Sequence, residues 1–346
     1  MAEEKRQKKW KLILNVFTLL ALVILIYAVR DQILNTISRL GEVNAWPLAL
    51  MLPAQYLNYY SYSNMYKNLF VILNEKVSFK FMFRVNSELN FVNNVFPSGG
   101  VSGFSYFGIR MRGVGITSGK ATLVQMMRFI LIFISFQVLL FSGLLVLALN
   151  GSVNNLVILI AGSLATLLLV GTVGTAFIVG SQKRINSFFT YITRTVNKLI
   201  NIIRPKHPET IDIKRVEKLF TELHENYLVF KKKPGLLKKP LMYALLANTA
   251  EIITIYVVYI AFGQWVNPGA VIIAYAIANF AGLISVLPGG IGVYEALMTA
   301  VLASAGVPAG VSLPVTVMYR ILNMTIQLPP GYVLYHKAVQ DNDIKI

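Results

Sequence analysis

Two arginines, Arg128 and Arg320, stand inside long apolar segments of the sequence. Arg128 comes about nine residues into the apolar run 121–149, and Arg320 has about the same depth in the run 311–335. At about 1.5 Å per residue, nine helical residues reach roughly 13 Å, close to the middle of a hydrocarbon core about 30 Å thick. A guanidinium group stays charged and matches phosphate oxygens in a bidentate geometry. The two residues therefore predict an interior site that binds a phosphate or another anion.

A glycine-rich break precedes each arginine by nearly the same distance. Arg128 lies 31 residues after Pro97, Arg320 lies 32 residues after Pro288, and a further glycine follows each proline at a distance of 18 residues. Broken backbone in a bilayer is tolerated only where it is buried in protein or lines a wet cavity, and a helix that starts there points its positive dipole end into that cavity. The shared spacing therefore predicts a duplicated unit whose two breaks shape one electropositive site. The breaks consist of Pro97, Ser98, Gly99 and Gly100, and of Pro288, Gly289, Gly290 and Gly292.

Further polar side chains accompany these breaks. Arg84, Glu88, Asn90 and Asn94 precede the first break, and Glu295 follows the second. Ionisable groups at membrane depth are costly and indicate function by default, although Arg84 and Glu88, four residues apart on one helix face, can also neutralise each other. Glu295 has no acidic counterpart after the first break. Three roles stay open for it: pairing with an arginine, receiving an amine headgroup, or carrying a coupling proton.

The sequence does not indicate an enzyme or a metalloprotein. It contains no cysteine, and its three histidines are scattered along the chain. Reactions of lipid-linked phosphates usually require a nucleophile paired with a base, or a metal held by carboxylates. We therefore predict no catalytic residue, no metal site and no cofactor.

The composition is typical of a membrane protein. Hydrophobic residues make up 55% of the 346 residues and charged residues 14%, whereas a soluble domain has about 25% charged residues. The net charge is +17, and the basic residues stand between the apolar segments. This pattern indicates positively charged cytoplasmic loops and not nucleic-acid binding. Segment 181–240 has 14 Lys/Arg against 5 Asp/Glu. We predict that it forms two basic amphipathic helices on the inner leaflet, and that both chain termini are cytoplasmic in a plasma-membrane protein.

The predicted fold is an all-α polytopic membrane protein with about six full crossings plus two re-entrant helical hairpins in an inverted repeat. The first crossing covers residues 12–29. Segment 79–109 is too short for two crossings of about 20 residues and a turn, so it is expected to dip into the membrane and return. With the charged loops inside, the two hairpins enter from opposite faces, as in secondary transporters. The predicted parts are an N-terminal helix and outer loop (1–45), the first repeat (46–149), a return crossing (150–180), the basic linker (181–240), and the second repeat with a short tail (241–346).

The sequence contains the motifs Pro97-Ser98-Gly99-Gly100, Leu287-Pro288-Gly289-Gly290-Ile291-Gly292-Val293-Tyr294-Glu295, Gly306-Val307 and Tyr319-Arg320. These motifs resemble those of a known family, the lysylphosphatidylglycerol synthase transmembrane, or flippase-like, family. The resemblance covers roughly residues 12–335. It implies a domain that moves lipids between leaflets, similar to the flippase domain of the bacterial multiple peptide resistance factor. Because the sequence stops at Ile346, the synthase activity of the larger relatives is not expected. Ser98, where some relatives have glycine, is a small departure from the family's motif.

The functional prediction is a lipid translocase that moves an anionic phospholipid or a polyprenyl-phosphate-linked lipid through a midplane cavity. Its partners are then membrane lipids with an anionic headgroup, and a homo-oligomer is compatible with the sequence. Two alternatives stay open at this point. One is a secondary transporter of a soluble anion, and the other is an intramembrane enzyme that acts on lipid-linked phosphates.

Overall fold

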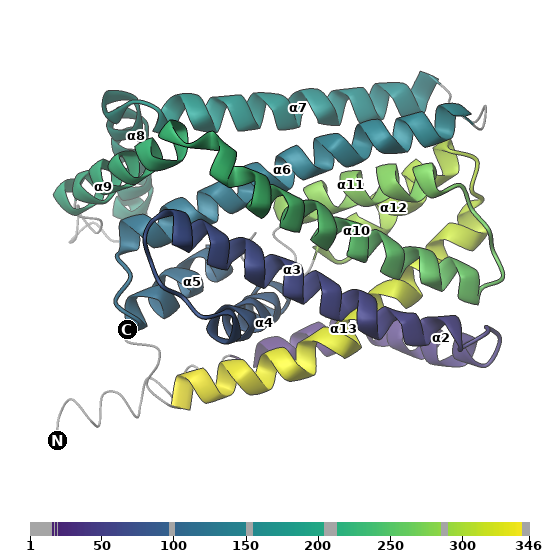
Figure 1. Ribbon diagram of the computed structural model, residues 1–346. Coiled ribbons are helices and arrows are strands. Elements are labelled where there is room, and N and C mark those ends of the chain that lie inside the picture. The colour runs from purple at the N-terminus through teal and green to yellow at the C-terminus, as the bar shows by residue number, and fades with distance from the viewer. Residues whose placement is uncertain are drawn as a thin grey trace.

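The computed structural model describes residues 16, 18, 20–96, 101–149, 155–203, 213–284 and 290–340. Every regular element in these ranges is a helix, which confirms the all-α prediction (Figure 1). In chain order the helices are α2 (Arg30–Leu40), η1 (Pro47–Leu50), α3 (Met51–Ile72), α4 (Phe79–Val95), α5 (Val101–Gly113), α6 (Ser118–Leu149), α7 (Asn155–Val179), α8 (Gln182–Ile203), α9 (Ile213–Lys232), η2 (Pro234–Leu237), α10 (Lys238–Ala261), α11 (Pro268–Ile284), α12 (Val293–Ser304) and α13 (Ala309–Gln340).

Three helical segments are long and apolar enough to cross a bilayer: Ser118–Leu149, Asn155–Val179 and Pro234–Ala261. A fourth is added if the bent pair near the N-terminus forms one span. Helices α3 and α13 have 22 and 32 residues, or roughly 33 and 48 Å at about 1.5 Å per residue. They are more polar than α6 and α7 because they carry the walls of an interior cavity. The chain is thus a multi-pass membrane protein.

The N-terminal region differs from the prediction of one crossing followed by an outer loop. A helix at Leu20–Ala28 is followed at once by α2, and the two are bent by 57°. Val29 lies at the bend with φ −106° and ψ 7°, outside the helical region. Residues 30–40 contain no proline or glycine and have Asp31 in their first turn, which favours the start of a new helix. The residues assigned to a loop are therefore largely helical.

The helices of the two predicted repeats pack in a matching pattern. Helix α3 pairs with α10 more extensively than any other two described helices pair. Helix α4 packs on α13 just as α11 packs on α6, while α5 packs on α6 just as α12 packs on α13. If α3, α4, α5 and α6 are exchanged in order with α10, α11, α12 and α13, these contacts map onto one another. The contact between α6 and α10 is an exception, because α3 and α13 do not make a matching one of similar extent. The α3–α10 pair therefore lies at the centre of a nearly two-fold arrangement.

The basic linker forms α8 and α9, as predicted, at one end of the bundle (Figure 1). These helices pack on each other, and α9 also packs on the start of α6. The Thr117 hydroxyl donates to the Glu222 carboxylate, and His224 Nδ1 lies 2.7 Å from the Val179 carbonyl oxygen. Leu223 and Phe230 are almost fully buried. The linker is thus joined to the membrane helices by side-chain contacts as well as by the chain itself.

Candidate functional site

A polar cavity of about 270 Å³ lies around the α3–α10 pair. Helices α3, α4, α6, α10, α11, α12 and α13 all contribute to its wall. Arg128, Arg320, Asn90 and Asn94, which are distant in sequence, come together here. Most of the lining side chains are amides, phenols or charged groups: Asn58, Tyr62, Tyr66, Asn86, Leu89, Asn90, Asn93, Asn94, Arg128, Glu251, Tyr275, Asn279, Tyr294, Tyr319, Arg320, Asn323, Met324 and Gln327.

Arg128 faces this cavity without a carboxylate partner among the described residues. Its Nε is buried and has no hydrogen-bond partner. The guanidinium carbon lies 5.6 Å and 5.7 Å from the ring centres of Tyr62 and Tyr66, and 5.4 Å from that of Phe129. Rings at such distances attract the cation but leave its N–H groups unused. The Tyr66 hydroxyl donates to Gln125 Oε1 at 3.0 Å, which fixes one of these rings.

Arg320, by contrast, forms a buried ion pair with Glu295. The Nη1 atom lies 3.0 Å from Glu295 Oε1, and the two side chains are 8% and 6% exposed. Glu295 Oε2 also accepts a hydrogen bond from the Gly292 N–H at 2.7 Å, because the Glu295 side chain reaches back to the residue that precedes α12. Gly292 has φ 83°, a conformation that a residue with a Cβ rarely adopts. Of the three roles left open for Glu295, the structure places it in the first, paired with an arginine.

Glu251 on α10 lines the cavity, and sequence reasoning did not select this carboxylate. Its Oε2 accepts from Gln55 Nε2 at 3.0 Å and from Asn58 Nδ2 at 3.1 Å. Its Oε1 accepts from Asn323 Nδ2 at 2.8 Å and from the Tyr319 hydroxyl. All four donors are uncharged. The centre therefore carries two carboxylates as well as two guanidinium groups, and it is less positive than the arginines alone predicted.

Asn90 connects α4 to this network. Its Nδ2 donates to the Tyr59 hydroxyl oxygen at 2.7 Å and to Gln327 Oε1 at 2.9 Å. Gln327 Nε2 in turn donates to Gln55 Oε1 at 2.7 Å. Asn94 donates to the backbone carbonyl of Asn90 at 2.8 Å. A continuous chain of hydrogen bonds thus runs from α4 through α13 and α3 to Glu251 on α10.

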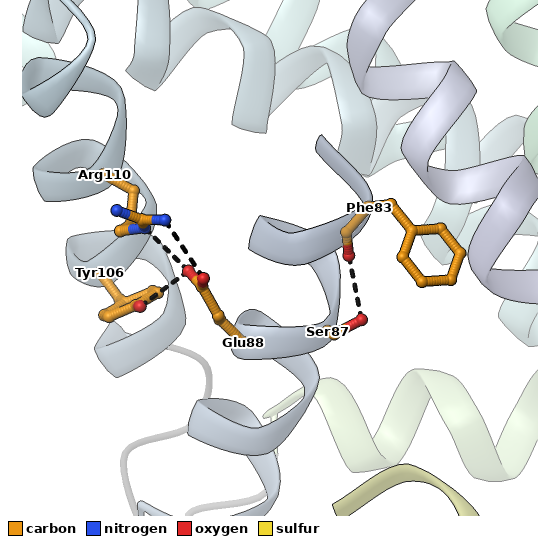
Figure 2. Close-up of polar contacts among 5 residues, drawn as sticks. All are labelled: Phe83, Ser87, Glu88, Tyr106 and Arg110. Carbon is orange, nitrogen blue, oxygen red and sulfur yellow. Dashed lines mark hydrogen bonds and ion pairs between the residues drawn. The ribbon is translucent and has the colours of Figure 1, made fainter. Parts of the chain in front are cut away.

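Glu88 does not pair with Arg84, so the mutual neutralisation that their spacing left open does not occur. Arg84 is exposed. Glu88 is buried and instead receives Arg110 Nε at 2.8 Å, Arg110 Nη2 at 3.2 Å and the Tyr106 hydroxyl at 2.8 Å (Figure 2). Arg110 and Tyr106 lie four residues apart on α5, so one face of that helix clamps the carboxylate. This bidentate pair holds the α4–α5 hairpin together, and neither Arg84 nor Glu88 lines the cavity.

The first backbone break, formed by Pro97, Ser98, Gly99 and Gly100, lies outside the described residues. Pro288 and Gly289 of the second break also lie outside them. Gly290 and Gly292 are described, and both have positive φ, at 67° and 83°. The second break therefore depends on backbone conformations that glycine adopts without a steric penalty.

The residues missed by sequence reasoning are chiefly amides. Asn323 and Gln327 follow Arg320 at three and seven residues, so they share its helix face. Gln55 and Asn58 show the same kind of spacing on α3. Across the described residues, no group of three or more His, Cys, Asp or Glu side chains is placed to hold a metal ion. The site is thus built from amides, phenols and a few charged groups.

Comparison with known proteins identifies the family. The family model described as "Lysylphosphatidylglycerol synthase TM region" matches residues 11–331. The chain belongs to this family. The match to the lysylphosphatidylglycerol synthase TM region covers nearly the whole chain, and it confirms the resemblance seen in the sequence.

Curated relatives are membrane proteins named only by their group. A UPF0104 membrane protein of Pyrococcus horikoshii is 25% identical over 183 residues, which cover 52% of this chain and 53% of the relative. A UPF0104 membrane protein of Methanothermobacter thermautotrophicus is 35% identical over 80 residues, or 23% of this chain and 24% of the relative. The matches thus span about half, or less, of the length of these relatives.

Proposed function

We propose that this lysylphosphatidylglycerol synthase TM region protein is a lipid translocase. It moves a phospholipid or a polyprenyl-phosphate-linked lipid between leaflets, with the phosphate passing Arg128. The protein is a transporter and not an enzyme. Its site lies in a plasma membrane, with both termini and the basic linker on the cytoplasmic side.

The observation that carries this proposal is the state of Arg128. An arginine inside a membrane domain normally has an anionic or carbonyl partner, since an uncompensated charge is costly there. Arg128 is partly buried, with aromatic neighbours, a buried Nε that has no hydrogen-bond partner among the described residues, and direct access to a cavity of about 270 Å³. A phosphate oxygen that enters the cavity supplies the missing acceptor in a charge-assisted hydrogen bond.

We further propose the architecture that such transport requires. Helices α3–α6 and α10–α13 form two inverted repeats, each with two crossings and one re-entrant hairpin, which together with the N-terminal helix and α7 gives six crossings. The matching packing of the two groups of helices supports this arrangement. Inverted repeats with broken helices at a central site allow the cavity to open alternately to either side.

The test is translocation of headgroup-labelled lipids in proteoliposomes that contain Arg128→Gln or the original protein. Loss of a hydrogen bond to a charged group is worth about 1.5–3 kcal/mol, so we expect translocation of phosphate-bearing lipids to slow by about tenfold or more. Arg112→Gln is the matched control, because Arg112 is exposed and does not line the cavity. Equal rates for Arg128→Gln and the original protein would contradict the proposal. So would uptake of a soluble anion without lipid movement.

A further inference from the structure

A second cavity, of about 490 Å³, lies away from the central one, where the end of α3 meets the end of α9, η2 and the start of α10. Its lining includes Lys232, Lys233, Lys238 and Lys239. No acidic residue lines it, and no salt bridge joins any of these lysines to an acidic group among the described residues. Four positive charges thus face one hollow without internal compensation.

The remaining wall of this lysine cavity is largely apolar. Val71 and Ile72 come from α3, Val229 from α9 and Leu236 from η2. Val71 is 54% exposed and Leu236 is 47% exposed, so both offer apolar surface to a ligand. Asn68 and Asn74 add hydrogen-bonding groups. The cavity therefore combines cationic groups with an apolar wall.

We infer that this cavity binds the headgroup of an anionic phospholipid from the leaflet on the side of the basic linker. The lysines contact the phosphate, and the glycerol and upper acyl chains lie against Val71 and Leu236. Two observations favour a lipid over a soluble phosphate. Part of the wall is apolar, and the cavity lies at the start of α10, where the span Pro234–Ala261 begins. Basic pockets beside membrane helices are known to recognise anionic headgroups.

The position of the site links a bound lipid to the helices of the central cavity. Its walls belong to α3 and α10, the pair at the centre of the fold, and to α9 of the linker. A lipid bound here joins the linker to that pair without entering the central cavity. The inference therefore stands or falls independently of the proposed translocation.

Binding of phosphatidylglycerol and of phosphatidylcholine to the detergent-solubilised full chain, measured by native mass spectrometry, tests the inference. One lysine near a membrane surface contributes about 1 kcal/mol to the attraction of anionic lipid, which is about fivefold in affinity. We expect Lys232→Gln with Lys238→Gln to lower phosphatidylglycerol affinity by about 25-fold and to leave phosphatidylcholine unchanged. The matched control is Lys183→Gln with Lys198→Gln, since both residues are exposed on α8 and outside the cavity. This control removes the same charge and is expected to change affinity less than twofold.

Three outcomes would overturn the inference. Equal losses in the two double variants would show diffuse attraction to basic residues instead of a site. Unchanged phosphatidylglycerol binding after Lys232→Gln with Lys238→Gln would exclude the lysines. Full competition by inorganic phosphate, with no effect of Val71→Thr with Leu236→Gln, would identify a soluble anion as the ligand. Val71 and Leu236 are exposed, so these substitutions leave the core intact, and unchanged gel-filtration elution checks the fold of each variant.

Discussion

The buried pair of Arg320 and Glu295 gives a sharp prediction about stability. Breaking a buried ion pair by removing one partner costs about 3–5 kcal/mol, because the other charge is left uncompensated. The contact here is 3.0 Å long, and both side chains are less than a tenth exposed. Arg320→Met and Glu295→Gln should therefore each lower the free energy of unfolding by about 3–5 kcal/mol. The more exposed pair of Lys120 and Glu75 serves as a comparison. These side chains are 25% and 28% exposed, and a solvent-exposed ion pair contributes about 0–1 kcal/mol to stability.

The assay is reversible unfolding by denaturing detergent in mixed micelles, followed by circular dichroism, for the two single variants and the double variant. Because Arg320→Met and Glu295→Gln remove the same interaction, the double variant should be more stable than the sum of the single changes predicts, by about 1–3 kcal/mol. Additive losses would refute the pairing. So would a single variant as stable as the original protein. The result also decides how Arg320 is used: a closed pair is chiefly structural, which leaves Arg128 as the arginine open to a ligand.

Three further predictions follow from the contacts of α4, α10 and α13. Glu88→Gln should lower the free energy of unfolding by about 3–5 kcal/mol in the same assay, whereas Arg84→Gln should change it by less than about 0.5 kcal/mol. A larger loss for Arg84→Gln than for Glu88→Gln would contradict the pairing of Glu88 with Arg110. Gly331→Ala places a Cβ 2.8 Å from both Phe91 Cβ and Ser87 O, so it should cost about 1–3 kcal/mol. Gly310→Ala is the control, because a Cβ at this position meets no atom within 4 Å. Equal losses of stability in the two variants would contradict the close approach of α4 to α13. Glu251→Gln sets an amide among donors that need an acceptor and should cost about 1–3 kcal/mol by the same measurement; an unchanged stability would show that these donors do not depend on the carboxylate.

The apolar helices and their approximate limits follow directly from the sequence. The segment predicted at 121–149 is α6 (Ser118–Leu149), and the return crossing predicted at 150–180 contains α7 (Asn155–Val179). Length and apolar content decide such elements, because a spanning helix satisfies all its backbone hydrogen bonds within itself. The same reasoning placed Arg128 and Arg320 at one depth, and both line the same cavity.

The partners of the charged side chains were not predictable in the same way. Spacing left open a pair between Glu88 and Arg84, but Arg84 is exposed and Glu88 is buried against α5. Glu251 receives donors from α3 and α13, as far as 196 residues away in the chain. No local periodicity carries such information, since it depends on how whole helices pack. Interior amides on one helix face, such as Asn323 and Gln327, were the available signal.

The central claim is that a phosphate-bearing lipid enters the cavity and contacts Arg128. The most direct measurement is an electron cryo-microscopy structure of the protein in nanodiscs that contain phosphatidylglycerol. The account predicts non-protein density in the cavity, with a phosphate within hydrogen-bond distance of the Arg128 guanidinium and absent in Arg128→Gln. A cavity filled only by water in both proteins, with Arg128 turned to a carboxylate of the chain, would contradict it.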